Sequence, residues 1–434
     1  MDEVLLLQDA PAQRGQQLGQ CQKALLKRVV SDFKVLCDKQ NLGPVELPGR
    51  ARELSTAINI LAPEWLIESR AIATAAEVGA ATLLALTLPP ERVQPSFLSK
   101  RANDSTALGA AGTALPPEML GMSKALLLEN ADGPDLVHFV LSRDASPGSL
   151  AYVALAEAGN MGIDAFVNSA GLSGAFHIGP PVQDNGQSAL SPSIILRHLC
   201  ERTSSCGQAL SEFESLQNRM GAGTPDKRGV IYIFADGTGE VMLLEASASR
   251  CHARRIANGA VILTNRFQHL IQPQSHIEPY RQRCLHEHLQ LEPLSLGRAL
   301  QAARIDKKFG SEKGVCDNNT RASFIAVPGS PDHPGFALVT LGSPLSHLPV
   351  PLFPGVGVPL SMLDGTLYTK GKEAAQIPPD KLLDYDGLLL QLLAPVLSGT
   401  PNRVQLQGIM NDAWKLSLEI SETLALEKAA EARV

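Results

Sequence analysis

The sequence has no excess of positive charge. It contains 38 lysines and arginines against 44 aspartates and glutamates, which gives a formal net charge of −6 at pH 7, and its pI is near 6.0. A surface that binds a phosphate backbone or an anionic membrane needs the opposite balance. We therefore expect neither a nucleic acid nor a membrane among the partners of this protein.

The sequence also lacks a disulfide framework and any spaced set of metal ligands. Its seven cysteines are odd in number and show no CxxC spacing, which is typical of reduced, mostly buried cysteines in a cytoplasmic protein. His286-Glu287-His288 lacks the i, i+4 spacing that places two ligands on one helix face, and Gly221-Ala222-Gly223 does not follow a strand as a dinucleotide fingerprint does. We expect no metal and no bound cofactor.

The sequence also shows no pattern typical of a targeting signal or of a membrane-spanning segment. Met1-Asp2-Glu3-Val4 lacks the basic and apolar regions of a secretory signal. The most apolar stretch, residues 71–88, contains Glu77 and several threonines, which favours a buried helix over a membrane span. With 44% hydrophobic and 19% charged residues, the composition fits a cytoplasmic globular protein with a large core.

The character of the chain changes near residue 105. Before it, helical spacing occurs in three segments, 14–39, 48–61 and 64–87. Gly15 and Gly19 in the first segment permit close packing against another element. The polar segment 91–104 has no periodicity and predicts a flexible linker that is open to cleavage. We expect residues 1–104 to form a helical unit that packs against a main domain over 105–434.

After residue 105 the patterns are those of strands, followed by helices. Strand-like runs cover 150–156, 161–167, 229–235, 240–246, 261–267, 322–327 and 336–341, and helical patterns cover 191–219, 279–306, 379–396 and 402–431. Asp236-Gly237-Thr238-Gly239 is a strong hairpin signal between two of the strands. Antiparallel strands bounded by helices predict stacked sheets with helical outer layers, an α+β fold.

A hydroxyl group stands at the start of the first of these strands. Ser105-Thr106 opens a strand of small residues, and a second strand follows over 123–133. Serine is a poor nucleophile unless a base lies close by, and the α-amino group of a strand's first residue can be that base because its pKa lies near 8. That amine exists only if the chain is cut before Ser105. The alternative is an ordinary β-hairpin.

Six short motifs follow one another along residues 14–330. They are Arg14-Gly15-Gln16-Gln17-Leu18-Gly19, Ser105-Thr106, Asn130-Ala131-Asp132, Asn168-Ser169-Ala170-Gly171-Leu172, Thr264-Asn265-Arg266-Phe267 and Thr320-Arg321-Ala322-Ser323. In this order they resemble the motifs of the acyl-coenzyme A:isopenicillin N acyltransferase family of N-terminal nucleophile (Ntn) hydrolases. Each motif is weak alone, and their order makes the resemblance specific.

The resemblance implies a four-layer αββα sandwich that is made by autocatalytic cleavage of a precursor. The cut is expected between Asp104 and Ser105, leaving the fragment 1–104 as a partner of the catalytic chain 105–434. The family acts on small amides or acyl thioesters, so acyl-CoA or another thioester is a candidate co-substrate, and we expect a role in specialised metabolism. Whether the acyl group is hydrolysed or transferred stays open, as does the formation of a homo-oligomer.

Carried over by position, the resemblance assigns roles around one serine. Ser105 is the nucleophile, and Thr106 takes its place if the cut falls one residue later. Asn265 supplies a side-chain N–H to the developing oxyanion. Asp132 holds the freed amine, and Arg321 orients Asp132 or the nucleophile through a charge-assisted contact. Each of these residues has a structural alternative as a turn or strand-edge residue.

Three further residues are candidates. The resemblance assigns Asn168 to a contact with the amine or the substrate, and its alternative is a turn-former before Gly171. Phe176 and His177 follow Gly174 and are candidates for lining a substrate pocket, with a structural role as the alternative.

The chain departs from the family in its nucleophile, because Ser105 stands where the family has cysteine. A thiol is partly ionised at neutral pH, whereas serine depends wholly on its base. Three explanations follow: a natural serine variant, an engineered replacement of cysteine that traps the precursor, or a disabled site. They lead to two functional classes, a self-processing acyltransferase or amidohydrolase and an unprocessed, inactive relative that serves as a binding or assembly protein.

Overall fold

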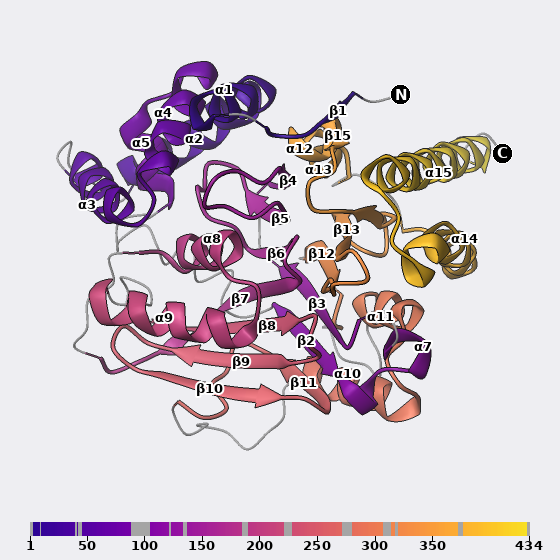
Figure 1. Ribbon diagram of the computed structural model, residues 1–434. Coiled ribbons are helices and arrows are strands. Elements are labelled where there is room, and N and C mark those ends of the chain that lie inside the picture. Colours follow the sequence, from indigo (N-terminus) through magenta and orange to yellow (C-terminus); the bar gives the residue numbers. More distant parts are fainter. Residues whose placement is uncertain are drawn as a thin grey trace.

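Two antiparallel β-sheets face each other at the centre of the computed structural model (Figure 1). The structure describes residues 3–8, 10–39, 41, 46–87, 105–120, 123–132, 137–184, 190–220, 228–270, 280–306, 314–316, 320–371 and 376–431. Side chains from the two sheets meet in a continuous apolar core, because β2 and β3 pack against β8 and β12 packs against β6. Most strands are buried on both faces and therefore carry long apolar runs.

The first sheet has seven strands in the order β10-β9-β8-β7-β6-β5-β4. Their bounds are Cys251–Ile256, Val241–Ala246, Arg228–Asp236, Leu172–Pro181, Ala165–Asn168, Tyr152–Glu157 and His138–Arg143. The predicted hairpin is β8–β9, in which the carboxylate of Asp236 accepts hydrogen bonds from the backbone N–H and the hydroxyl of Thr238.

The second sheet has six strands in the order β11-β2-β3-β12-β13-β14. Their bounds are Gly259–Leu263, Thr106–Ala111, Ala125–Asp132, Thr320–Val327, Phe336–Leu341 and Val350–Leu352. A separate two-stranded ribbon pairs β1 (Val4–Leu5) with β15 (Val358–Pro359), which brings the beginning of the described chain to the C-terminal part.

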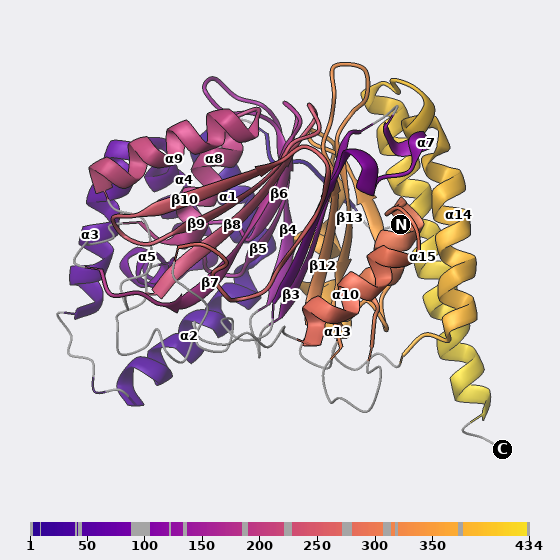
Figure 2. The same cartoon turned by 90° about the horizontal axis from the view of Figure 1, so that it is seen from below.

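Helices cover the outer face of each sheet (Figure 2). On the seven-stranded side lie α8 (Pro192–Arg202) and α9 (Cys206–Met220). On the six-stranded side lie α10 (Tyr280–Leu291), α11 (Leu296–Ala303), α14 (Pro379–Ser398) and α15 (Arg403–Glu431). Short helical turns are η1 (Gly112–Ala114), α7 (Pro117–Leu120), α12 (Leu360–Leu363) and α13 (Thr366–Gly371). The predicted α+β fold, a four-layer αββα sandwich with a helical N-terminal segment, is confirmed.

The N-terminal helices form a unit beside α8 (Figure 1). They are α1 (Pro11–Cys21), α2 (Lys23–Lys39), α3 (Glu46–Leu61), α4 (Pro63–Ala76) and α5 (Ala80–Thr87). A Cβ atom on Gly15 would lie 2.3 Å from the carbonyl oxygen of Glu68, and one on Gly19 would lie 2.5 Å from that of Ile72. As predicted, these two glycines permit close packing, and the element they pack against is α4.

A buried ion network joins this unit to the sandwich. Arg143 of β4 contacts Glu68 Oε2 of α4 at 3.0 Å and Glu201 Oε1 of α8 at 2.6 Å. Arg197 of α8 contacts the same two carboxylates at 3.1 and 2.9 Å. Burial by itself would raise the pKa of both carboxyl groups. The charges of the two guanidiniums have the opposite and larger effect, so the pKa of Glu68 is lowered and that of Glu201 is about 2.

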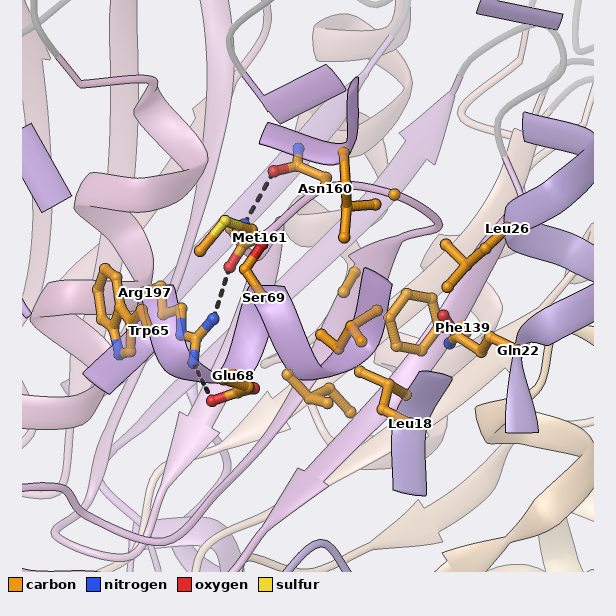
Figure 3. Close-up of a pocket in the computed structure, with 16 residues that line it drawn as sticks. Leu18, Gln22, Leu26, Trp65, Glu68, Ser69, Phe139, Asn160, Met161 and Arg197 are labelled. Atoms are coloured by element: carbon orange, nitrogen blue, oxygen red, sulfur yellow. Dashed lines mark hydrogen bonds and ion pairs between the residues drawn. The ribbon is translucent and has the colours of Figure 1, made fainter. Parts of the chain in front are cut away.

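A narrow cavity lies next to this network, between α1, α4 and the outer face of β4 and β5 (Figure 3). Leu18, Phe139 and Met161 line its apolar part, while Ser69 and Arg197 lie at its polar side.

The predicted domain boundary at residues 104 and 105 stays a prediction, because Asp104 and the rest of the segment 91–104 lie outside the described residues. Among the described residues, no helix is long and apolar enough to cross a membrane.

Candidate active site

Four neighbouring strands bring most of the predicted site residues to one end of the six-stranded sheet. Ser105 directly precedes β2, and Asn265 follows the end of β11, its neighbour. On the other side of β2, the register pairs Thr106 with Asn130 of β3, and Thr320 of β12 pairs with Asp132. Arg321 lies at the irregularity that follows Thr320. Residues far apart in the sequence thus form one row across the strand ends.

The two candidate nucleophiles point toward different layers of the fold. Side chains alternate along a strand, so Ser105 shares a face with Ala107 and Gly109. A Cβ atom on Gly109 would lie 2.6 Å from Val241 Cγ1 of the other sheet, which identifies this face as the one between the sheets. Thr106 is buried on the opposite face, where its Oγ1 accepts a hydrogen bond from Arg281 of α10 at 3.5 Å.

Asn265 links the two sheets beside Ser105. Its Nδ2 donates a hydrogen bond to the carbonyl oxygen of Ile178 in β7, 3.0 Å away. An amide nitrogen carries two hydrogens, so this bond orients the side chain and leaves a second N–H for another acceptor. The predicted oxyanion role of Asn265 needs such an oriented donor.

A carboxylate that sequence reasoning missed shapes the segment after Asn265. Glu245 of β9 is fully buried and accepts hydrogen bonds from the backbone N–H groups of Gln268, His269 (2.9 Å) and Leu270 (2.6 Å). Three bonds to one carboxylate fix the path of the loop that carries Asn265. The signal was a lone glutamate in the apolar strand Val-Met-Leu-Leu-Glu-Ala, a position that requires a partner when buried.

A second missed carboxylate pairs with a predicted residue. His177 Nε2 lies 2.9 and 2.7 Å from the two carboxylate oxygens of Glu129, and both side chains are buried between the sheets. Glu129 pairs in register with Ala107 and therefore lies on the same face as Ser105. Burial raises the pKa of the Glu129 carboxyl, and His177 offsets this only in part. The space between the sheets thus has a polar wall near Ser105.

Phe176 does not share this location with His177. Neighbouring residues in β7 point to opposite faces, and the ring of Phe176 packs on the helix-facing side against Tyr232, at 6.1 Å between centroids. Tyr232 in turn contacts Phe213 of α9. Phe176 and His177 therefore do not face the same space, and a role of either residue in substrate binding stays a prediction.

Asn168 lies at the other end of the sandwich. Its Nδ2 donates to the carbonyls of Cys200 and Thr203 at 2.8 Å each, and its Oδ1 accepts from the N–H of Leu172 at 2.9 Å. The six residue-to-residue steps from Leu172 to Ile178 along β7 span about 20 Å. Its side chain shapes the turn and holds the end of α8, as in its structural alternative, and the contact with the amine or the substrate stays a prediction.

Some predictions fall on residues outside the described part of the chain. These are the cut after Asp104, the linker 91–104, the loop Gly221-Ala222-Gly223 and the side chain of Asp132, of which only the backbone pairing is described. All seven cysteines lie within the described residues, and all are free thiols there.

Residues 124–293 match the family model of acyl-coenzyme A:6-aminopenicillanic acid acyl-transferase. The chain therefore resembles this family of Ntn hydrolases, as the order of the six motifs predicted. The matched segment contains Asp132, Asn168 and Asn265 and begins after Ser105. Among curated proteins, no match is found.

Three solved structures are similar to parts of the chain. The Caenorhabditis elegans ortholog of N-acylethanolamine-hydrolyzing acid amidase is 14% identical over 52% of this chain and 94% of its own. Penicillin V acylase from Agrobacterium tumefaciens is 13% identical over 60% and 87%, and a variant of conjugated bile acid hydrolase from Clostridium perfringens is 11% identical over 57% and 92%. Each has a TM-score of 0.36, a value too low to carry an argument about this chain.

Proposed function

From the resemblance of residues 124–293 to the acyl-coenzyme A:6-aminopenicillanic acid acyl-transferase family, we propose that this protein is a self-processing amidohydrolase or acyltransferase with Ser105 as its nucleophile. One observation carries the proposal. Ser105 directly precedes β2 on the face between the sheets, and Asn265, oriented by its bond to Ile178, follows the end of the neighbouring strand β11.

Processing is the first step of the proposal. Ser105 Oγ attacks the carbonyl carbon of Asp104, the C–N bond between the two residues breaks, and an ester with a free Ser105 amine forms. Water then hydrolyses this ester and releases the carboxylate of Asp104 and the hydroxyl of Ser105. The fragment 1–104 is proposed to stay bound after the cut, which the buried contacts of Glu68 with Arg143 and Arg197 support.

Acyl transfer is the second step. The α-amino group of Ser105, with a pKa near 8, takes the proton as Oγ attacks the carbonyl of a small amide or acyl thioester. The C–N or C–S bond of the substrate then breaks, and the same amine returns the proton to the leaving amine or thiol. A side-chain N–H of Asn265 donates to the oxyanion, a contact typically worth about 3 kcal/mol in the transition state. Asp132 and Arg321 are proposed to hold the amine, since both backbone positions lie at the same strand ends.

The acyl-enzyme is then resolved by water or by an amine that accepts the acyl group. In the proposal no bound cofactor takes part, and acyl-CoA or a similar thioester enters as a co-substrate. The substrate class is a small amide or thioester in specialised metabolism.

The experiment that tests this function is intact mass with N-terminal sequencing of the purified chain. We expect a large fragment that starts at Ser105, followed by acyl-enzyme formation with amide or thioester substrates. A fragment that starts at Thr106 would move the nucleophile one residue along.

A second candidate is an unprocessed relative that binds rather than catalyses, and it is favoured by the serine in place of the family's cysteine. An uncut chain would support this reading if Ser105→Cys also stays uncut. Cleavage of Ser105→Cys alone would show that the machinery is intact and that the serine stalls it.

A further inference from the structure

Two histidines meet where the edges of the two sheets come together. β10 is an edge strand of the seven-stranded sheet, and it contacts β11, an edge strand of the six-stranded sheet (Figure 1). His252 lies in β10, and His269 lies in the segment that follows β11. The centroids of their rings are 4.9 Å apart, with an angle of 38° between the ring planes. The fold thus pairs two imidazoles that no spacing in the sequence connects.

One buried carboxylate fixes the backbone at both histidines. Glu245 of β9 pairs in register with His252, so the two side chains lie on the same face of the sheet. The carboxylate of Glu245 also accepts a hydrogen bond from the backbone N–H of His269 at 2.9 Å, and further bonds from those of Gln268 and Leu270. The fold therefore holds the two imidazoles near each other before any ligand arrives.

Both imidazoles are open to solvent. His252 and His269 are exposed side chains. Within the part of the chain that the structure describes, each ring contacts the other, and neither makes a hydrogen bond or an ion pair. A neutral imidazole offers one nitrogen lone pair to a metal ion. The pair therefore presents two nitrogen ligands at the surface of the protein.

The separation of the rings fits two ligands of one metal ion. Zinc binds imidazole nitrogen at about 2.1 Å in tetrahedral geometry, which places the centroids of two imidazoles on one ion roughly 5 Å apart. The observed separation is 4.9 Å. Aromatic rings in simple contact also have centroids about 4.5–7 Å apart. Metal binding by the chain distinguishes an ion site from a ring contact alone.

We propose that His252 and His269 bind a divalent transition-metal ion such as Zn²⁺ or Cu²⁺. Imidazole nitrogen suits these ions, whereas Mg²⁺ and Ca²⁺ prefer oxygen ligands. Water completes the coordination, so the site is open to exchange. Such an ion links the edge strand β10 to the segment that also carries Asn265. The proposal does not depend on the proposed function.

The test is zinc binding by the full chain after removal of metal with a chelator. Calorimetry with ZnCl₂ should show one bound equivalent in the unaltered protein. His252→Ala and His269→Ala should each weaken this binding by roughly 100-fold, because the second imidazole of a chelating pair acts at a high effective concentration. The matched control is His286→Ala, which removes another exposed histidine, from α10, and should bind zinc as the unaltered chain does.

Copper(II) gives a second readout at the same site. Its electron paramagnetic resonance spectrum should show coupling to two imidazole nitrogens in the unaltered chain and to one in either alanine variant. An unaltered chain that binds neither ion stoichiometrically would overturn the proposal. Binding that is unchanged in both alanine variants, with their fold verified by circular dichroism, would overturn it as well. None of these readouts uses enzyme activity, so their outcome leaves the assignment of Ser105 untouched.

Discussion

The side chain of Asn265 donates a hydrogen bond to the backbone carbonyl of Ile178 across the two sheets, at 3.0 Å. This contact holds the segment after β11 against β7, beside the point where Ser105 leads into β2. An amide that is oriented before the substrate arrives loses little freedom during the reaction, which is the condition for an effective oxyanion donor.

Replacing Asn265 by alanine should lower kcat by about 100- to 1,000-fold while KM changes little, because the lost N–H acts on the oxyanion of the transition state. Steady-state kinetics on an identified amide or thioester substrate measures both constants. Gln268→Ala is the matched control, since Gln268 lies in the same loop and its side chain donates to Ile262. An unchanged kcat in Asn265→Ala would remove Asn265 from the oxyanion role.

The opposite orientations of Ser105 and Thr106 give a second prediction. Ser105→Ala should leave an intact and inactive chain. Thr106→Val should still be cut before Ser105, because the Thr106 hydroxyl faces Arg281 and the helical layer. Measurement of the intact mass of each purified variant distinguishes the two outcomes. Activity in Ser105→Ala would refute the assignment of the nucleophile.

The buried ion network should make a large contribution to stability. Glu201→Gln removes the carboxylate charge that Arg143 and Arg197 share. Removing one partner of a buried pair leaves uncompensated charge and costs about 3–5 kcal/mol, which chemical denaturation can measure. In contrast, Arg403→Gln, which breaks the exposed pair with Asp144, should change the unfolding free energy little.

The same carboxylate predicts an acid dependence. The pKa of Glu201 is about 2 in the folded chain and near 4.3 in the unfolded chain. The pKa of Glu201 is lower in the folded chain than in the unfolded chain. The ionised carboxylate therefore stabilises the fold fully above about pH 4.3, and this contribution is lost as the pH falls toward 2. The stability difference between the unaltered protein and Glu201→Gln should therefore shrink between pH 5 and pH 3. A difference that grows with acid would contradict the lowered pKa.

Gly109 tests the contact between the two sheets. A Cβ atom there would lie 2.6 Å from Val241 Cγ1 and 3.1 Å from Ile233 Cδ1. Gly109→Ala should therefore destabilise the fold by about 1–3 kcal/mol through overpacking. The control is Gly408→Ala in α15, where a Cβ atom meets nothing within 4 Å and helix propensity favours alanine by about 1 kcal/mol. Equal thermal shifts in both variants would show that Gly109 is not a packing constraint.

The order of elements was predictable from local patterns. The glycines of α1, the hairpin of β8 and β9 and the change from helices to strands near residue 105 are all encoded by neighbours in the chain. Side-chain periodicity and turn chemistry act over a few residues, so they can be read without a structure. The row formed by Ser105, Asn265 and Arg321 was anticipated only through the resemblance to a family.

The tertiary structure determined which residues from distant segments of the chain contact one another. The contacts of Asn168 with the end of α8 could not be predicted, because a motif records the order of residues and not the direction in which its strand runs. Glu129 and Glu245 were missed because the role of a lone carboxylate in an apolar strand depends on its hydrogen-bond partners. Those partners belong to other elements of the fold. Composition and periodicity in the sequence determined the layers. Strand register, which sets contacts over about 5 Å between segments far apart in the chain, decided which residues meet.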